Sequence, residues 1–124
     1  MVEKSVKISY KFRYSERLHH NKDFVKVLKS GRKLVRPAIF VYIYCRNDGS
    51  DLCRLGLVTS GKIGKAVERN KVKRRLREIF RLNKHLFKPG YDIIFMPKTE
   101  SKNLSYSELK KNILELLKTG KLLK

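Results

Sequence analysis

Side chains that bind phosphate are concentrated between residues 65 and 85. On a helical wheel drawn at about 100° per residue, one arc of this segment carries six cations, and Asn70 lies among them. We call these six residues the cationic ridge: Arg69, Lys73, Arg74, Arg77, Arg81 and Lys84. A guanidinium binds phosphate through paired hydrogen bonds, and a lysine binds it as a mobile point charge. The segment therefore has the chemistry to grip a phosphate backbone.

A charged helix face is ordinarily only solvated, and this possibility competes with phosphate binding. Like charges three or four residues apart cost roughly 0.2–0.5 kcal/mol per pair in an isolated helix. Only Glu68 and Glu78 offset the cations of this segment. Because the composition is so one-sided, an anionic partner accounts better for the ridge.

Groups that catalyse hydrolysis are not gathered in the sequence. His19 and His20 are adjacent and so do not readily face one site, and His85 lies near the expected end of a helix. The carboxylates that a two-metal nuclease would need are scattered along the chain. Cys45 and Cys53 are too few for a zinc site, and we expect reduced thiols rather than a disulfide across a hairpin. We predict no catalytic residue and no metal site in the protein itself.

The overall charge agrees with a polyanionic partner. The 124 residues include 31 Lys and Arg against 11 Asp and Glu, which gives a formal net charge of +20. Self-repulsion on this scale opposes folding, and nucleic acid is the leading candidate to neutralise it. A basic membrane-surface protein would need an anchor helix or a lipidation signal, and neither is evident. With no recognisable secretory signal or membrane span, we expect a cytoplasmic protein.

Several elements must position these side chains. Residues 21–31 predict a short helix that Asn21 caps and Gly31 ends. Residues 39–45 and 52–60 are rich in β-branched and aromatic residues, which indicates two strands. The turn formers Asn47, Asp48 and Gly49 lie between them, so we predict a hairpin.

The long helix of residues 65–85 has an apolar side beside the ridge, and we expect this side to pack on the sheet. It carries Val72, Leu76, Ile79 and Phe80. Residues 91–96 predict a buried strand that joins the same sheet. Ser105 and Glu108 form a capping box that begins a last amphipathic helix.

These elements predict a single α/β domain over residues 1–124. We expect a two-layer sandwich of a small mixed sheet, with about four strands, and three helices in the order α-β-β-β-α-β-α. Within residues 1–16 the alternating pattern suits a strand or an extended arm. It consists of Ile8, Tyr10, Phe12 and Tyr14.

Most of the chain resembles a known family. The run Arg69-Asn70-Lys71-Val72-Lys73-Arg74, continued by Arg77-Glu78-Ile79-Phe80-Arg81, is similar to the signature helix of the bacterial ribonuclease P protein. The segment Lys62-Ile63-Gly64-Lys65-Ala66-Val67 is similar to the preceding loop, and Lys22-Asp23-Phe24 with Gly31 to the first helix. The resemblance covers about residues 17–118. Two positions depart from it: Lys71 stands where arginine is common, and Gly61 where relatives often carry lysine.

The resemblance implies a subunit that binds RNA and does not cut it. In the family, a catalytic RNA holds magnesium ions and removes the 5′ leader of precursor tRNA. The helix face implied to dock on that RNA carries Arg69, Asn70, Lys71, Lys73, Arg74 and Arg77. The leader is expected in a cleft between the first helix and the sheet, lined by Phe24, Leu28, Phe40 and Tyr42, with Lys62 and Lys65 compensating for the cation missing at Gly61. The family also implies a left-handed crossover around the signature helix.

The residues of the expected cleft also fit a hydrophobic core. Phe24 and Leu28 lie at helical spacing, and Phe40 and Tyr42 alternate along a strand, so core packing explains all four residues as well as base stacking does.

Other functions are also possible for the whole protein. A ribosomal or other structural RNA-binding protein would share the charge and the basic helix but not the order of motifs. A nucleoid protein that coats duplex DNA and a protein-only nuclease are further alternatives.

Overall fold

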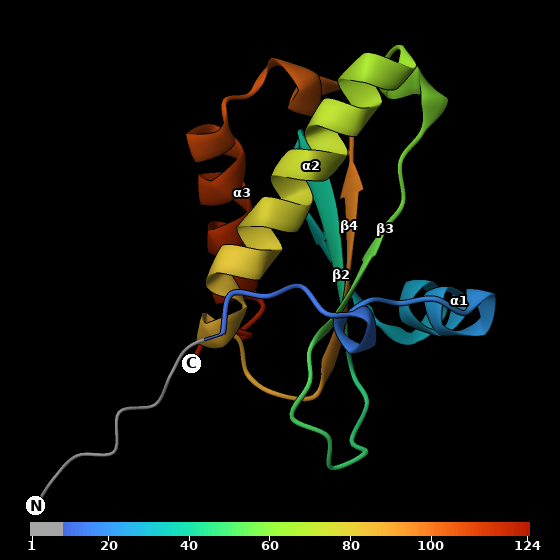
Figure 1. Cartoon of the computed structure of the whole chain (residues 1–124), viewed down its shortest axis with the longest axis vertical. Helices are drawn as coiled ribbons and strands as arrows, with labels where there is room; N and C mark the ends of the chain where they lie inside the picture. The colour runs from blue at the N-terminus through green and yellow to red at the C-terminus, as the bar shows by residue number, and fades with distance from the viewer. Residues whose placement is uncertain (1–8) are drawn as a thin grey trace, which may run out of the picture.

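The computed structural model describes residues 9–124, and Ile8 of the alternating pattern lies outside the described residues. Three helices and four strands form the fold (Figure 1). The helices are α1 (Asn21–Ser30), α2 (Ala66–Asn83) and α3 (Tyr106–Thr119). The strands are β1 (Arg32–Val35), β2 (Ile39–Cys45), β3 (Arg54–Leu57) and β4 (Tyr91–Pro97). This is the predicted α/β order, with one sheet and three helices.

The four strands form one mixed sheet in the order β1-β2-β4-β3. β2 pairs antiparallel with both β1 and β4, whereas β3 pairs parallel with β4. The predicted hairpin of residues 39–45 with 52–60 is therefore wrong, because β4 lies between those two strands. The turn formers at 47–49 do change the chain direction, but they lead to the far edge of the sheet. The hairpin that does form joins β1 to β2.

The connection from β3 to β4 runs through α2, and its hand is visible in Figure 1. Both strands point upward there, α2 lies in front of the sheet, and the chain passes from β3 on the right to β4 on its left. With the helix toward the viewer, this sense is left-handed, the opposite of the usual rule. It agrees with the crossover that the family resemblance implies.

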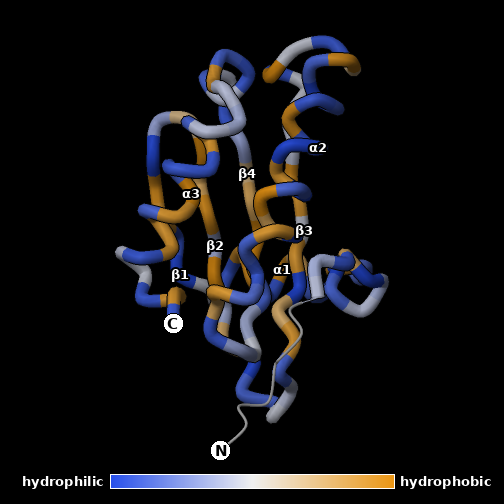
Figure 2. The backbone as a smooth tube through the Cα atoms, turned by 60° about the vertical axis from the view of Figure 1, so that its left-hand side comes forward, coloured by the Kyte–Doolittle hydropathy of each residue, from blue (hydrophilic) through white to orange (hydrophobic). Residues whose placement is uncertain are grey.

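The main core lies between the sheet and the pair α2 and α3. Ile39, Val41 and Ile43 alternate along β2 toward these helices and are at most 2% exposed. The predicted apolar side of α2 meets them: Val72, Leu76, Ile79 and Phe80 are all buried. Figure 2 shows hydrophobic and hydrophilic turns alternating along α2, as expected for a helix with one buried side. Burial of this stripe fixes which face of α2 points to solvent.

The opposite face of the sheet is covered only in part, by α1. Leu18, Val27 and Ile94 form a second, smaller buried cluster there. α1 begins at Asn21, but the capping residue is His20, which makes no side-chain cap hydrogen bond, so the predicted cap at Asn21 is wrong. The helix ends at Ser30, before Gly31, as predicted. The part of this sheet face that α1 leaves open carries Phe40 and its neighbours.

A buried carboxylate ties the sheet together below α1. Asp92 of β4, with its side chain 3% exposed, accepts hydrogen bonds from Arg46 Nη1 at 2.7 Å and from Arg54 Nε and Nη2, both at 2.7 Å. These charge-assisted bonds raise the pKa of the Arg54 guanidinium. We call this group the Asp92 clamp. It fixes edge strand β3 to β4.

The segment before α1 crosses the C-terminal half of α2 (Figure 1). Phe12 packs on Phe80 with ring centroids 5.4 Å apart, and a short 3-10 turn follows at Tyr14–Glu16. Arg17 then forms an isolated bridge with Leu55 of β3. We call residues 10–17 the N-terminal strap. Of the two structures that the alternating pattern suits, the extended arm is the one observed.

Among residues 9–124, the helices are too short or too polar to span a membrane.

Candidate nucleic-acid interface

The first two-thirds of α2 present cations to solvent. Lys71, Arg74 and Arg77 are exposed, as is Asn70, and Lys73 is half-buried. Within residues 9–124, none of these four cations forms an ion pair, since the pairs that do form use other residues. Their charge is therefore available to an outside anion. This is the part of the predicted ridge that the fold leaves intact.

The C-terminal end of the ridge is used within the protein. Arg81 pairs with Glu78, and its guanidinium lowers the pKa of that carboxyl while its own pKa is raised. Arg81 also donates to the Tyr10 carbonyl at 3.0 Å, and Lys84 forms a 2.5 Å ion pair with Glu16. The prediction of a continuous ridge through Arg81 and Lys84 is thus wrong. Both cations hold the N-terminal strap, which a helical wheel cannot reveal.

At the other end of the ridge, Arg69 is also engaged within the protein. Its side chain is half-buried and its Nη1 donates to the Gly64 carbonyl at 2.7 Å. Gly64 has φ +148°, a conformation that favours glycine, and a Cβ there would crowd the Glu68 carboxylate. Arg69 therefore fastens the loop that enters α2, and part of its guanidinium is already engaged.

The predicted aromatic residues lie on the half-open face of the sheet. Phe40 and Tyr42 alternate with the buried residues of β2 and are half-buried. Phe24 and Leu28 of α1 are also half-buried, and they pack with Tyr42 against the second cluster. These four side chains share one face, as predicted, and each keeps part of its surface in solvent. Core packing and an accessible surface therefore coexist at these residues.

Two cations beside Phe40 could not be anticipated from the sequence. Lys33 Nζ lies 4.3 Å and Lys98 Nζ 4.2 Å from the centre of the Phe40 ring. Lys33 stands directly opposite Tyr42 in the β1–β2 register. Strand β1 has no strong sequence signal, so its pairing could not reveal this neighbour. Lys33 and Lys98 together place positive charge around the Phe40 ring.

The predicted cations Lys62 and Lys65 separate in the structure. Both are exposed, but only Lys62 lines the hollow of about 550 Å³ that also contains Phe40, Pro97 and Lys98. Lys65 precedes the first turn of α2 and is not among the residues of that hollow. Lys62 thus belongs with the aromatic face, and Lys65 lies nearer to the cations of α2.

A smaller hollow links the two surfaces around the edge of β3. Phe24 of α1 and Arg77 of α2 both line it, together with Arg17 of the strap. Gly56 also lines it, and the Phe24 ring approaches this glycine so closely that a Cβ there would lie 2.6 Å from the ring. The cationic helix and the aromatic face are therefore joined by a groove.

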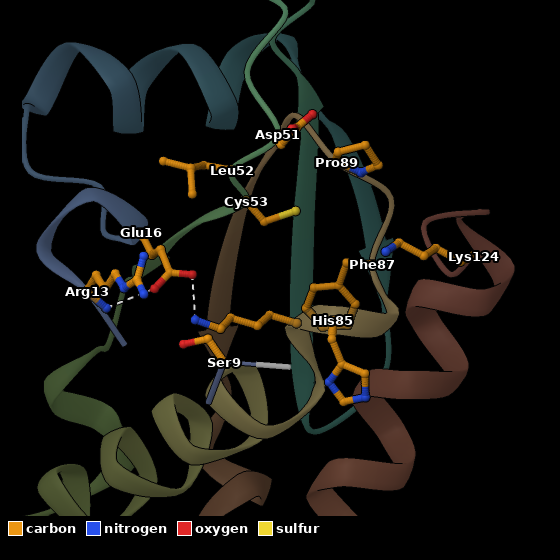
Figure 3. Close-up of a pocket in the computed structure, with 11 residues that line it drawn as sticks. Ser9, Arg13, Glu16, Asp51, Leu52, Cys53, His85, Phe87, Pro89 and Lys124 are labelled. Carbon is orange, nitrogen blue, oxygen red and sulfur yellow. Dashed lines mark hydrogen bonds and ion pairs between the residues drawn. The ribbon is translucent and has the colours of Figure 1, made fainter. Parts of the chain in front are cut away.

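Another hollow, of about 500 Å³, lies between the strap and the C-terminal end of α2 (Figure 3). Its lining mixes Arg13 and Lys124 with Glu16 and Asp51, and Cys53 lies at its wall. Lys84 also lines this hollow and pairs with Glu16, which holds the strap on α2. We assign this hollow to the packing of the strap.

The described residues contain no cluster of three or more His, Cys, Asp or Glu side chains that could hold a metal ion. Both cysteines are free thiols, as expected; Cys45 is exposed and Cys53 buried. Burial raises the pKa of the Cys53 thiol, so it stays protonated and unreactive.

Fold and site together define a class of protein. The chain is a small basic α/β protein in which exposed cations on one helix lie next to a half-open aromatic sheet face, as in proteins that bind RNA.

Comparison with known proteins identifies the family. The family model Ribonuclease P matches residues 12–121, and the chain belongs to this family. The ribonuclease P protein component of Alkaliphilus oremlandii is 41% identical over 102 residues, covering 82% of this chain and 88% of the relative. That of Thermotoga maritima is 39% identical, covering 86% and 93%.

Solved structures agree with the sequence comparison. The ribonuclease P protein of Staphylococcus aureus superposes with a TM-score of 0.79 at 32% identity, covering 88% of this chain and 98% of that one. The Thermotoga maritima protein in complex with 1-(4-fluorophenyl)-2-thiourea gives a TM-score of 0.74 at 37% identity, with 82% and 97% covered. The chain is thus a protein subunit of ribonuclease P, the ribonucleoprotein endoribonuclease of tRNA processing. The ribosomal, nucleoid and protein-only alternatives are set aside.

Proposed function

We propose that this subunit binds ribonuclease P RNA through the exposed face of α2 and the 5′ leader of precursor tRNA across the half-open sheet face. The RNA holds the magnesium ions and cuts the phosphodiester, in the cytoplasm. On the protein, the described residues offer no cluster that fits a magnesium ion, and we assign it no chemical step. Its work is to bind and to position.

The observation that carries the proposal is the set of unpaired cations on α2. Lys71, Lys73, Arg74 and Arg77 have no ion-pair partner within residues 9–124, although eight ion pairs form elsewhere. Like charges so close together are relieved when phosphates replace small counterions, and this release favours binding. Asn70 adds a donor and an acceptor for a sugar or base. We therefore assign RNA docking to Asn70, Lys71, Lys73, Arg74 and Arg77, with Arg69 contributing its remaining donors.

Half-burial of the aromatic face supports leader binding. Phe40 is half-buried, and the ammonium groups of Lys33 and Lys98 lie over its ring. A base that stacks on Phe40 displaces one of these flexible side chains, and the cations attract its phosphates. Stacking does not require a particular base, which suits a subunit that accepts many precursors. Phe24, Leu28 and Tyr42 continue this surface under α1, and Lys62 extends its charge. Leu28 offers apolar contact but no aromatic stack.

The docking surface is tested with the double variant Arg74→Ala/Arg77→Ala. Each lost phosphate contact should reduce the slope of log affinity against log salt concentration by about 1. At fixed salt, the variant should also bind ribonuclease P RNA at least about tenfold more weakly. Filter binding over a range of salt concentrations measures both quantities. The control is Lys111→Ala/Lys118→Ala, which removes the same charge from exposed positions on α3. Equal losses in the two variants would make the effect one of net charge and contradict docking by α2.

The leader surface is tested separately with Tyr42→Ala in the assembled holoenzyme. Loss of a stacking surface should weaken binding of leader-bearing precursor by about 1–3 kcal/mol and leave mature tRNA unaffected. Tyr42→Phe keeps the ring and serves as the matched control. Equal weakening for precursor and mature tRNA would contradict leader binding by Tyr42 and show that its role is structural.

A further inference from the structure

An aromatic pair lies outside the predicted leader surface, at the end of the N-terminal strap. The rings of Tyr14 and His19 are stacked, with centroids 3.7 Å apart and an interplanar angle of 16°. A hydrogen-bond contact of 2.7 Å between His19 Nε2 and the Tyr14 carbonyl oxygen links the same two residues. Even so, Tyr14 is 75% exposed. A large ring is thus held in a fixed orientation without being buried by the described residues.

The other exposed tyrosine of the strap differs from Tyr14. Tyr10 is 43% exposed and packs edge-on against His85 at 5.7 Å, so it is part of the contact between strap and helix. Tyr14 differs: among the described residues its aromatic partner is His19, which is itself exposed. Packing therefore does not explain why Tyr14 is oriented.

Exposed cations lie beside the pair in sequence. They are Arg13 and Arg17, and Arg17 also lines the adjoining hollow with Tyr14 and His19. Two carboxylates line the adjoining hollow, but each has an arginine partner: Asp48 with Arg46 at 3.0 Å, and Asp23 with Arg54 at 3.9 Å. Arg46 and Arg54 also bind Asp92, so these two guanidiniums offset the three carboxylates only in part. An aromatic surface flanked by cations is the arrangement that binds unpaired nucleotides.

The pair also adjoins the groove that joins the two proposed RNA surfaces. His19 and Arg17 line the same hollow as Phe24 and Arg77. A single strand that leaves the aromatic face at Phe24 therefore passes directly beside His19. This continuity points to the strand that occupies the aromatic face, rather than to an unrelated ligand.

We propose that the exposed face of Tyr14, backed by His19, stacks an unpaired base of the precursor 5′ leader beyond the part bound at Phe24, Phe40 and Tyr42. This inference rests on the proposed leader surface and extends it around the edge of β3. Arg17, whose guanidinium lies over the Phe12 ring and lines the hollow beside Tyr14 and His19, attracts a phosphate next to the base. The Tyr14–His19 pair is thus a second stacking site for the same strand.

The test uses holoenzyme reconstituted with ribonuclease P RNA, and precursors whose leaders are shortened one nucleotide at a time. With Tyr14→Ala, affinity for the longest leader should fall about tenfold, the effect of one lost base stack. The loss should vanish below one leader length and be absent for mature tRNA. Tyr14→Phe should bind as the unaltered protein does, and Tyr14→Leu as the alanine variant does.

The possible failures are distinguishable. If Tyr14→Ala binds every leader normally while Tyr42→Ala weakens them, the second stacking site is wrong and the proposed leader surface stands. If neither variant discriminates precursor from mature tRNA, both assignments fail. If Tyr14→Ala weakens assembly with ribonuclease P RNA and spares leader binding, the base belongs to the catalytic RNA and the inference is overturned.

Discussion

The cations of α2 differ in what lies within reach of each side chain. Arg81 and Lys84 have carboxylates and backbone carbonyls of the strap around them, whereas Arg74 and Arg77 face solvent. The sequence shows the same residue types at the same helical spacing in both groups. Only tertiary contacts separate the cations that hold the protein together from those that face solvent, to which we assign RNA binding.

The Asp92 clamp supplies a test at the level of single residues. Removal of Asp92 takes the shared buried carboxylate from the Arg46 and Arg54 guanidiniums and leaves them only the more exposed partners Asp48 and Asp23. Breaking a buried ion pair is strongly destabilising. We expect Asp92→Ala to lower the free energy of unfolding by about 3 kcal/mol, measured by urea denaturation.

The control for the clamp is Asp48→Ala. Asp48 also pairs with Arg46, but its side chain is 48% exposed, and surface pairs contribute little. The free energy of unfolding of Asp48→Ala should be close to that of the unaltered protein. Similar losses in both variants would mean that the buried position of Asp92 does not matter, contrary to this prediction.

At the level of elements, the strap is fixed to α2 by a few polar contacts. Glu16 accepts from Lys84 Nζ and from the Arg13 amide, and its side chain is 9% exposed. Glu16→Gln removes the carboxylate and keeps the shape of the side chain, so the nearly buried ammonium of Lys84 loses its counter-charge. We expect local stability of the strap to fall by about 1–3 kcal/mol.

Amide hydrogen exchange measures that loss directly. The Arg17 and Leu18 amides, which donate to Tyr14 and Leu55, should exchange faster in Glu16→Gln, while amides of β2 should not change. Glu115→Gln, at an exposed pair with Arg36, is the matched control. Unaltered exchange at Arg17 and Leu18 would show that the ion pair does not hold the strap.

The elements themselves were largely predictable, because their signals are local. The apolar stripe of α2, the capping box at Ser105 and the apolar run of β4 each indicate one element, and each forms. Pairing of strands depends on contacts far apart in sequence, so the turn at residues 47–49 suggested a hairpin that does not exist. β1 was not assigned a position, because Arg32 and Lys33 on an exposed edge strand give no apolar alternation.

The candidate site was predictable to the same extent. Family resemblance placed Phe24, Leu28, Phe40 and Tyr42 on one face, and the structure brings them there. Lys33 and Lys98 were missed because they reach Phe40 only through strand pairing and the end of β4. A stack such as Tyr14 on His19, five residues apart outside regular structure, has no periodic signal at all.

At the level of the whole molecule, the fold separates binding from stability. The left-handed crossover places α2 against one sheet face, with its cations outward, while α1 leaves part of the other face open. Of the cations behind the net charge of +20, a few hold the fold together, among them Arg46, Arg54 and Lys84, and those on the exposed face of α2 form no ion pair within residues 9–124. Assembly with RNA is therefore expected to be strongly salt-dependent.

Reconstitution tests the central claim most directly. The protein is added to a bacterial ribonuclease P RNA at a magnesium concentration too low for the RNA to act efficiently alone, and release of the 5′ leader is measured. We predict marked stimulation by the protein with RNA, and no cleavage by the protein with magnesium alone. Cleavage by the protein alone, or an RNA activity that the protein leaves unchanged, would contradict a subunit that works by binding and positioning RNA.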